Sequence, residues 1–158
     1  YIVMGVSGCG KSTVGALLAK ALARPFYDAD DFHPVENINK MANGTALTDD
    51  DRSPWLSLLA DKMVNWEASG GAVLACSALK QSYRDILSST TENAVTFVYL
   101  KGTKAVLHAR LTNRESHFMP DTLLDSQLQT LEPPTDAIIV SIDNPVAQNI
   151  TQILKDIN

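Results

Sequence analysis

The chain has 158 residues, of which 45% are hydrophobic and 20% charged, a composition typical of a globular protein of about one domain. Its net charge of −5 at pH 7 argues against a nucleic-acid backbone as its partner. No apolar run is long enough to predict a membrane span. Cys9 and Cys76 have neither metal-ligand spacing nor the pattern of a disulfide framework, so we expect a reducing cytoplasm. Because Tyr1 lies inside an expected strand and is not Met, we also expect residues before it.

The first expected strand, residues 1–4, leads into GVSGCGKST at 5–13. This stretch matches the phosphate-loop pattern G-x-x-x-x-G-K-[ST], and a helix-forming run at 14–23 follows it. The alternative, a Gly-rich turn between strand and helix, would not require Lys-Ser at the helix start. We therefore predict a loop that binds a nucleoside triphosphate, with Lys11 on the outer phosphates and the Ser12 hydroxyl on Mg²⁺. The residues expected to contact the nucleotide here are Gly8, Cys9, Gly10, Lys11, Ser12 and Thr13.

A second strand is expected at 25–28, and it ends in the acidic run Asp28-Ala29-Asp30-Asp31. Side chains two apart in a strand point to the same side, so Asp28 and Asp30 are both expected to face the phosphate loop. One can hold Mg²⁺ through water while the other accepts a proton from an attacking hydroxyl. Solvated capping acids are the alternative, and we assign that role to Asp31. For Asp30 we favour a functional role.

Continuous apolar runs at 72–76, 95–100 and 137–142 predict three further strands that are buried on both faces. Helical segments alternate with the strands, among them 55–66 behind Thr48, 104–113 behind Thr103 and 146–157 behind Pro145. Trp55, Leu58, Leu59 and Met63 share one helical face and are expected in the core. The pattern predicts a single α/β domain over 1–158, a three-layer fold with a five-stranded parallel sheet.

Two polar stretches are longer than ordinary connections. The first excursion runs from residue 33 to about 66 and includes the Asn- and Asp-rich stretch 33–51. The second runs from about 114 to 134. In an open α/β sheet, both would emerge at the carboxyl ends of the strands. We expect the first to bind the phosphate acceptor and the second to act as a lid.

Two groups of basic residues carry the remaining site predictions. After the third strand, Ser77 is expected to cap a helix on which Lys80 and Arg84 share one face near the positive end of the helix dipole, an arrangement that favours a bound anion. A solvated basic face is the alternative. Arg110 and Arg114 lead into the lid, where they could close over a triphosphate or, alternatively, stabilise a helix end. His117 either binds substrate or packs beside its neighbour Phe118.

Together these features predict phosphoryl transfer from a nucleoside triphosphate to a hydroxyl group. The first excursion contains Arg52, His33 and many hydrogen-bonding side chains but little apolar surface to hold a nucleobase. A small polyhydroxylated anion therefore suits it best as the acceptor.

The sequence closely resembles the gluconate kinases. The resemblance rests on GVSGCGKST, on DADDFHP at 28–34, on KMANGTALTDDDRSPWL at 40–56 and on CSALK at 76–80 with YRD at 83–85, and it extends in order along the chain. It implies a nucleoside-monophosphate-kinase-like fold and a dimeric cytosolic enzyme that uses ATP and Mg²⁺ to phosphorylate D-gluconate on its 6-hydroxyl. Relatives often carry Ser or Ala at the position of Cys9.

The resemblance also implies roles for single residues. Asp30 would take the proton of the 6-hydroxyl, and Arg114 would act in the lid as a catalytic cation. Arg110 would lie near adenine, and Asn144 and Pro145 would lie in a loop over the base. The residues expected around gluconate are Asp30, His33, Arg52, Ser77, Lys80, Arg84 and His117, without an assignment of the cation that meets the carboxylate.

Two alternatives remain. A shikimate kinase shares the D-x-D of the second strand but lacks the KMANG and CSALK blocks. A small GTPase would need an Asn-Lys-x-Asp guanine-binding motif, and the only Asn-Lys here, Asn39-Lys40, continues as Met41-Ala42.

Overall fold

The computed structural model describes residues 1–113 and 121–157. In chain order its elements are β1 (Ile2–Met4), α1 (Lys11–Ala21), β2 (Phe26–Asp28), the 3-10 turn η1 (Ala29–Phe32), α2 (Val35–Ala42), α3 (Asp49–Ala68), β3 (Val73–Ala75), α4 (Gln81–Ser88), β4 (Phe97–Lys101), α5 (Lys104–Thr112), α6 (Asp121–Thr130), β5 (Ile138–Ser141) and α7 (Val146–Ile157). Within these ranges, no helix combines the length and the apolar character needed to cross a membrane.

The strands form a five-stranded sheet in the order β2-β3-β1-β4-β5, and every neighbouring pair is parallel. The central strand, β1, has no exposed surface at Ile2, Val3 or Met4. This burial explains why the strand reads as an unbroken apolar run, because both of its faces are covered. The predicted α/β fold is confirmed.

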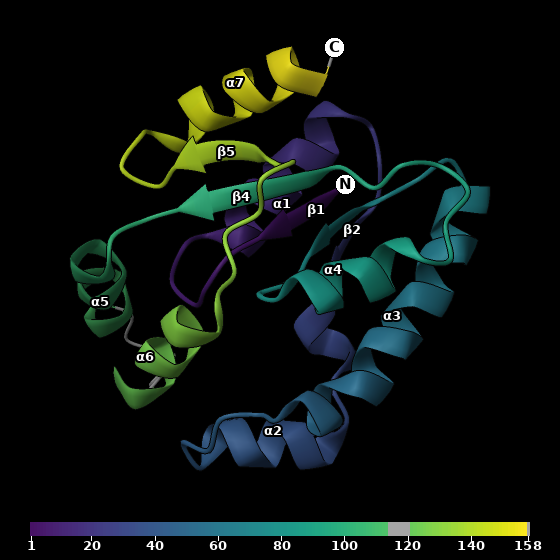
Figure 1. Ribbon diagram of the computed structural model, residues 1–158. Coiled ribbons are helices and arrows are strands. Elements are labelled where there is room, and N and C mark those ends of the chain that lie inside the picture. Colours follow the sequence, from purple (N-terminus) through teal and green to yellow (C-terminus); the bar gives the residue numbers. More distant parts are fainter. Residues whose placement is uncertain (114–120, 158) are drawn as a thin grey trace.

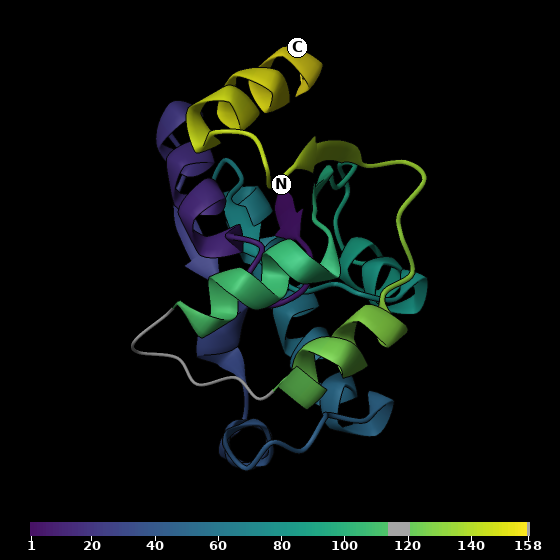
Figure 2. The same ribbon diagram turned by 90° about the vertical axis from the view of Figure 1, so that its left-hand side faces the viewer.

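Helices cover both faces of the sheet. Helices α1 and α7 pack against each other on one face, and α3 and α4 pack together on the other. Figure 2, turned by 90°, shows α1 on one side of β1 and α4 on the opposite side. Gly15 allows the close approach of α1 to β2, because a Cβ at this position would lie 2.6 Å from a ring carbon of Phe26. The phosphate-loop helix is therefore fixed against the strand that ends in the acidic run.

The carboxyl ends of the strands face the helices of the two excursions. In Figure 1, β4 runs toward α5, and α6 lies beside α5, while α2 stands farthest from α7. Helix α3 begins with a complete capping box: Thr48 Oγ1 accepts from the Asp51 N–H, and the Asp51 carboxylate accepts from the Thr48 N–H. Thr103 likewise caps α5, as predicted.

Three local predictions were wrong. The strand expected at 137–142 is not buried on both faces, because Ile139 of the edge strand β5 is 45% exposed. The helix after β3 begins at Gln81 with Lys80 at its N-cap, so Ser77 does not cap it. Leu58 was expected in the core but is 43% exposed, because α3 directs Trp55, Leu59 and Met63 inward and leaves Leu58 on the outer side.

Candidate active site

The phosphate loop follows the central strand and leads directly into α1. Gly8 and Gly10 have φ values of 83° and 96°, in the left-handed region that favours glycine. Gly10 is also the N-cap of α1 and supplies no side chain to cap its first N–H groups. Uncapped N–H groups at the start of an 11-residue helix, with the dipole behind them, form an anion-binding site. Lys11 Nζ donates to the Val6 carbonyl oxygen at 3.2 Å, so the cation lies against the loop.

Ser12 and Asp28 are joined directly, because the Ser12 hydroxyl donates to Asp28 Oδ2 at 2.6 Å. The other oxygen of this carboxylate accepts the Asp30 N–H at 3.1 Å. Among the described residues there is no cluster of three or more His, Cys, Asp or Glu that could hold a metal. A hydroxyl and one carboxylate beside a phosphate loop nevertheless fit Mg²⁺, which keeps several water molecules and takes its other ligands from phosphates.

A cavity of about 330 Å³ lies on one side of the loop and has the size of a small-molecule site. It brings together several predicted nucleotide contacts, namely Gly8, Cys9, Gly10, Thr13, Arg110 and Asn144. The Arg110 guanidinium donates to the Ile142 carbonyl oxygen, which fixes it against the loop after β5. Pro145 does not line this cavity, whereas its neighbour Val146 does.

A second cavity, of about 90 Å³, lies on the acceptor side of the same loop. Its walls come from the phosphate loop, η1, the first excursion, the loop after β3 and α6. The residues that line it are Ser7, Lys11, Asp30, His33, Met41, Ala46, Leu47, Arg52, Trp55, Ser77, Leu79, Leu123, Ser126 and Gln127. The structure therefore brings Lys11, Asp30, His33, Arg52 and Ser77 together, as the sequence predicted.

Asp30 and His33 face each other in this cavity, with Asp30 Oδ1 3.8 Å from His33 Nε2. Burial raises the pKa of the Asp30 carboxyl; Lys11 opposes this effect, and Asp28 adds to it. The side chain nevertheless has 78% of its surface accessible, so the raised pKa reflects the surrounding walls of an open cleft rather than full enclosure. Asp30 lies in η1, because β2 ends at Asp28, so strand alternation was the wrong reason for its orientation.

His33 is held in place by an aromatic ring and an amide. Its imidazole stacks on Trp55 with ring centroids 4.1 Å apart, and its Nδ1 lies 3.4 Å from Asn37 Nδ2. Burial lowers the pKa of His33, Asp30 opposes this effect, and Arg52 adds to it. His33 is therefore a neutral hydrogen-bonding group near pH 7.

Arg52 and Lys80, both predicted to meet the substrate, occupy different positions. Arg52 lines the cavity, and its guanidinium donates to the Leu47 carbonyl oxygen at 2.6 Å. Lys80 forms an ion pair with Asp49 at 2.8 Å and is not part of the cavity wall. The Tyr83 hydroxyl also donates to Asp49, so this carboxylate fastens α4 to the start of α3.

Arg84 requires a correction, because it is only 2% exposed and shares no exposed basic face with Lys80. Its guanidinium donates to the carbonyl oxygens of Ala78, Leu79 and Glu132 and to the Gln81 side chain. Ala78 has a positive φ of 44°, a conformation that costs energy for a residue with a side chain. We therefore remove Arg84 from the acceptor contacts: it holds the loop that carries Ser77 into the cavity.

Arg114 and His117 lie outside the described residues, so their predicted lid and substrate roles stay predictions.

Among the residues of the acceptor cavity that were not anticipated as site residues, Trp55 and Gln127 make defined contacts within the site. Trp55 was assigned to the core alone, but besides stacking on His33 it donates its indole N–H to the Ala29 carbonyl oxygen at 2.8 Å. Gln127 of α6 accepts the Ser7 N–H of the phosphate loop at 2.7 Å. Helical spacing predicts that Trp55 is buried, but nothing local to Gln127 in the sequence indicates a contact 120 residues away.

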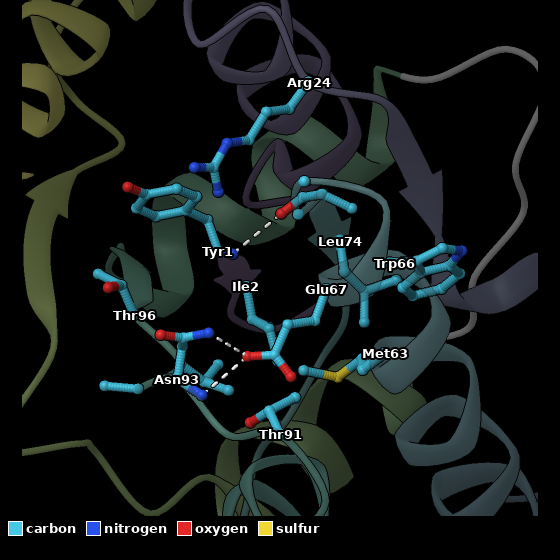
Figure 3. A pocket seen from close by; sticks show the side chains of 15 residues that line it. Tyr1, Ile2, Arg24, Met63, Trp66, Glu67, Leu74, Thr91, Asn93 and Thr96 are labelled. Atoms are coloured by element: carbon cyan, nitrogen blue, oxygen red, sulfur yellow. Dashed lines mark hydrogen bonds between the residues drawn. The ribbon is translucent and has the colours of Figure 1, made fainter.

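A larger cavity, of about 480 Å³, lies at the amino ends of the strands. Figure 3 shows Tyr1 and Arg24 on one side of it and Trp66 and Glu67 on another. The Glu67 carboxylate accepts the backbone and side-chain N–H groups of Asn93, both at 2.7 Å. This cavity is remote from the phosphate loop, so its size does not make it the active site.

Comparison with known proteins distinguishes between a gluconate kinase and a shikimate kinase. The shikimate kinase family model matches residues 7–157. A probable gluconokinase of Xenopus tropicalis is 43% identical in an alignment that covers 99% of this chain and 92% of the relative. The crystal structure of a gluconokinase from Sinorhizobium meliloti 1021 superposes with a TM-score of 0.89 at 44% identity, over 98% of this chain and 88% of that chain.

By contrast, the shikimate kinase of Aquifex aeolicus is 18% identical, with a TM-score of 0.64 over 99% of this chain and 94% of that chain. At this identity the likeness extends to the fold alone. Because its sequence similarity to gluconokinases spans almost its whole length, this chain belongs to the gluconokinase family.

Proposed function

We propose that this protein phosphorylates D-gluconate, transferring the terminal phosphoryl group of ATP to the 6-hydroxyl to give 6-phospho-D-gluconate and ADP. The observation that carries this proposal is the position of the phosphate loop between two cavities, one lined by Arg110 and Asn144 and the other by Asp30, His33 and Arg52. Membership of the gluconokinase family identifies the acceptor.

Asp30 is the proton acceptor in this proposal. It lines the acceptor cavity together with Lys11, so a hydroxyl bound there lies between a carboxylate and the phosphate-binding cation. As the 6-oxygen forms its bond to phosphorus, its proton passes to Asp30 and the bond to the bridging oxygen of ADP breaks. Lys11 and the N–H groups of the loop stabilise the negative charge on the transferred group. Ser12 and Asp28 would hold Mg²⁺, which neutralises phosphate charge when bound.

Arg52 is the proposed partner of the gluconate carboxylate. Among the described residues, Lys11 and Arg52 are the Lys and Arg side chains that line the acceptor cavity, and Lys11 belongs to the phosphate end. A guanidinium can bind a carboxylate through two parallel hydrogen bonds. Neutral His33 and Ser77 then remain for the hydroxyl groups. Lys80 and the undescribed Arg114 and His117 are proposed as further contacts when the excursions close.

The family resemblance also supports a cytoplasmic homodimer that works on a small molecule, away from nucleic acids and membranes. Size-exclusion chromatography with light scattering would test the dimer, for which a mass near 34 kDa is expected from a 17.1 kDa chain.

The experiment that tests the activity measures ADP release with ATP and Mg²⁺ across gluconate, other sugar acids and shikimate. We expect gluconate to give the highest kcat/KM, and mass spectrometry to find one added phosphate on it. The Lys11→Ala variant, purified in the same way, controls for contaminating kinases and should lose several kcal/mol of transition-state stabilisation, about 10²-fold or more in rate. Turnover of shikimate without turnover of gluconate would overturn the proposal, and a strong preference for GTP would reopen the GTPase reading.

A further inference from the structure

Gln127 links the second excursion to the phosphate loop through a defined contact. Its Oε1 accepts the Ser7 N–H at 2.7 Å, and both residues line the acceptor cavity. Because a backbone N–H can only donate, the oxygen of the Gln127 amide must face Ser7. The orientation of the amide is therefore fixed, and its NH₂ group points away from the Ser7 N–H, on the other side of the Cγ–Cδ bond.

The peptide group that Gln127 contacts is held at both ends. The N–H of the Val6–Ser7 peptide donates to Gln127, and the carbonyl oxygen of the same peptide accepts from Lys11 Nζ at 3.2 Å. Cys9 N–H also donates to this oxygen, at 3.3 Å. Gln127 therefore shares a peptide unit with the phosphate-binding lysine, at the boundary between the phosphate loop and the acceptor cavity.

Sugar hydroxyls need donors as well as acceptors. Among the described residues that line the cavity, Lys11 and Arg52 are committed in our proposal to phosphate and carboxylate, and Asp30 accepts the transferred proton. The Gln127 side chain is half-buried in α6, next to Ser126 on the same wall. No hydrogen bond from its Nε2 is found within the described part of the chain.

We propose that Gln127 binds the acceptor directly: its amide nitrogen donates a hydrogen bond to a hydroxyl of gluconate while its oxygen stays on the Ser7 N–H. This proposal rests on the proposed function. It makes Gln127 a specificity-determining residue, which ties the presence of the correct polyol to the geometry of the phosphate loop.

The test pairs two variants with deoxygenated substrates. Gln127→Met keeps the length of the side chain but loses both polar contacts, whereas Gln127→Glu keeps an oxygen for Ser7 and loses the donor. We expect both variants to raise KM for gluconate about 3- to 10-fold, the range of one neutral hydrogen bond, and to raise it more than KM for ATP. Gln129→Met, on an exposed position of the same helix, is the matched control and should behave as wild type.

Deoxygluconates that lack one hydroxyl each identify the contact. With the wild-type enzyme, KM for one of these analogues should exceed KM for gluconate by about the same factor. With Gln127→Met, KM for that analogue should equal KM for gluconate, because the hydrogen bond is already absent. The inference is overturned if either folded variant keeps the wild-type KM for gluconate, or if only KM for ATP rises. It is also overturned if removing a hydroxyl from gluconate raises KM by the same factor in variant and wild type for every analogue. Absence of gluconate turnover in the wild-type enzyme would instead refute the proposed function, so the two failures are distinguishable.

Discussion

At the scale of single residues, the acceptor cavity combines a carboxylate that titrates at raised pH with an imidazole that stays neutral. Asp30 gains protons more readily than an ordinary Asp, because the walls of the cleft disfavour its charge more than Lys11 favours it. His33 loses its proton more readily, because burial disfavours its charge. The lowered pKa leaves His33 a neutral hydrogen-bonding group near pH 7, and Asp30 is the side chain that we propose as the base.

We expect Asp30→Asn to lower kcat about 10²- to 10⁴-fold, the usual contribution of a general base, with the Kd for ATP nearly unchanged. Since Asp30 must be deprotonated to act and its pKa is raised, kcat/KM should fall on acidification at a pH above the ordinary Asp value of about 3.9. Steady-state kinetics across pH measures both effects. Asp31→Asn, at an exposed neighbouring position, is the control. Wild-type activity in Asp30→Asn would reduce Asp30 to a structural role.

Sequence reasoning reached Asp30 because three acids after one strand exceed what a turn requires, yet η1, not strand alternation, gives its orientation. It wrongly placed Arg84 among the substrate contacts. Helical spacing predicts the face on which a side chain lies, but it does not show that backbone carbonyl oxygens bind the guanidinium there. It missed Gln127, because that contact depends on how α6 packs on the phosphate loop. Local motifs thus predict which residues are reactive, while long-range packing decides which of them meet.

At the scale of secondary structure, the first turn of α3 organises the first excursion. Asp51 completes the capping box with Thr48 and also accepts two hydrogen bonds from Lys40 of α2, at 2.7 and 2.9 Å. The Lys40 and Thr48 contacts lower the pKa of Asp51 to about 2. The ion pair between Lys40 and Asp51 therefore fixes the position of α2 relative to the start of α3, where Arg52 also lies.

Replacing the cap should weaken this connection. We expect Thr48→Ala to lower the free energy of unfolding by about 1 kcal/mol, the typical cost of losing an N-cap side chain. Urea denaturation followed by circular dichroism measures the change. Thr45→Ala, an exposed threonine in the same loop, should stay within about 0.5 kcal/mol of wild type. Equal losses in the two variants would show that the cap contributes nothing specific.

The inner strands were predictable as elements because burial on both faces requires apolar runs. The edge strand β5 was found for the same reason although it is not buried on both faces, since Ile139 is 45% exposed. The start of α4 was not, because its N-cap is Lys80, which makes no side-chain capping bond and leaves no recognisable pattern. The Gln81 N–H is satisfied instead by the Glu132 carboxylate at 2.7 Å, from a residue 51 positions away.

At the scale of the whole molecule, the two halves of the site differ in how open they are. The nucleotide cavity measures about 330 Å³, but the acceptor cavity only about 90 Å³, below the range of about 300–1,000 Å³ usual for small-molecule sites. The walls of the acceptor cavity include Met41 of α2 and Leu123 of α6, so an acceptor bound there contacts both helices.

Amide hydrogen exchange should detect these contacts. We expect gluconate, added together with ADP, to change the exchange rates of α2 and α6, because the ligand alters the packing of both helices. The reference is the protein with ADP alone, because α7 lines the cavity assigned to the nucleotide but not the acceptor cavity; relative to that reference, exchange in α7 should stay the same. Unchanged rates in α2 and α6 under saturating gluconate would show that the pocket is already formed.

The stacking of Trp55 on His33 also gives the protein a built-in optical probe. The indole ring stacks on an imidazole of the acceptor cavity with an interplanar angle of 14°, so we expect its fluorescence to respond to the protonation of His33 and to a ligand bound in that cavity. The other tryptophan, Trp66, stacks on Tyr27 and does not line that cavity. With Trp66 replaced by Phe, the emission of a single residue would follow acceptor binding in real time, without a label and without turnover.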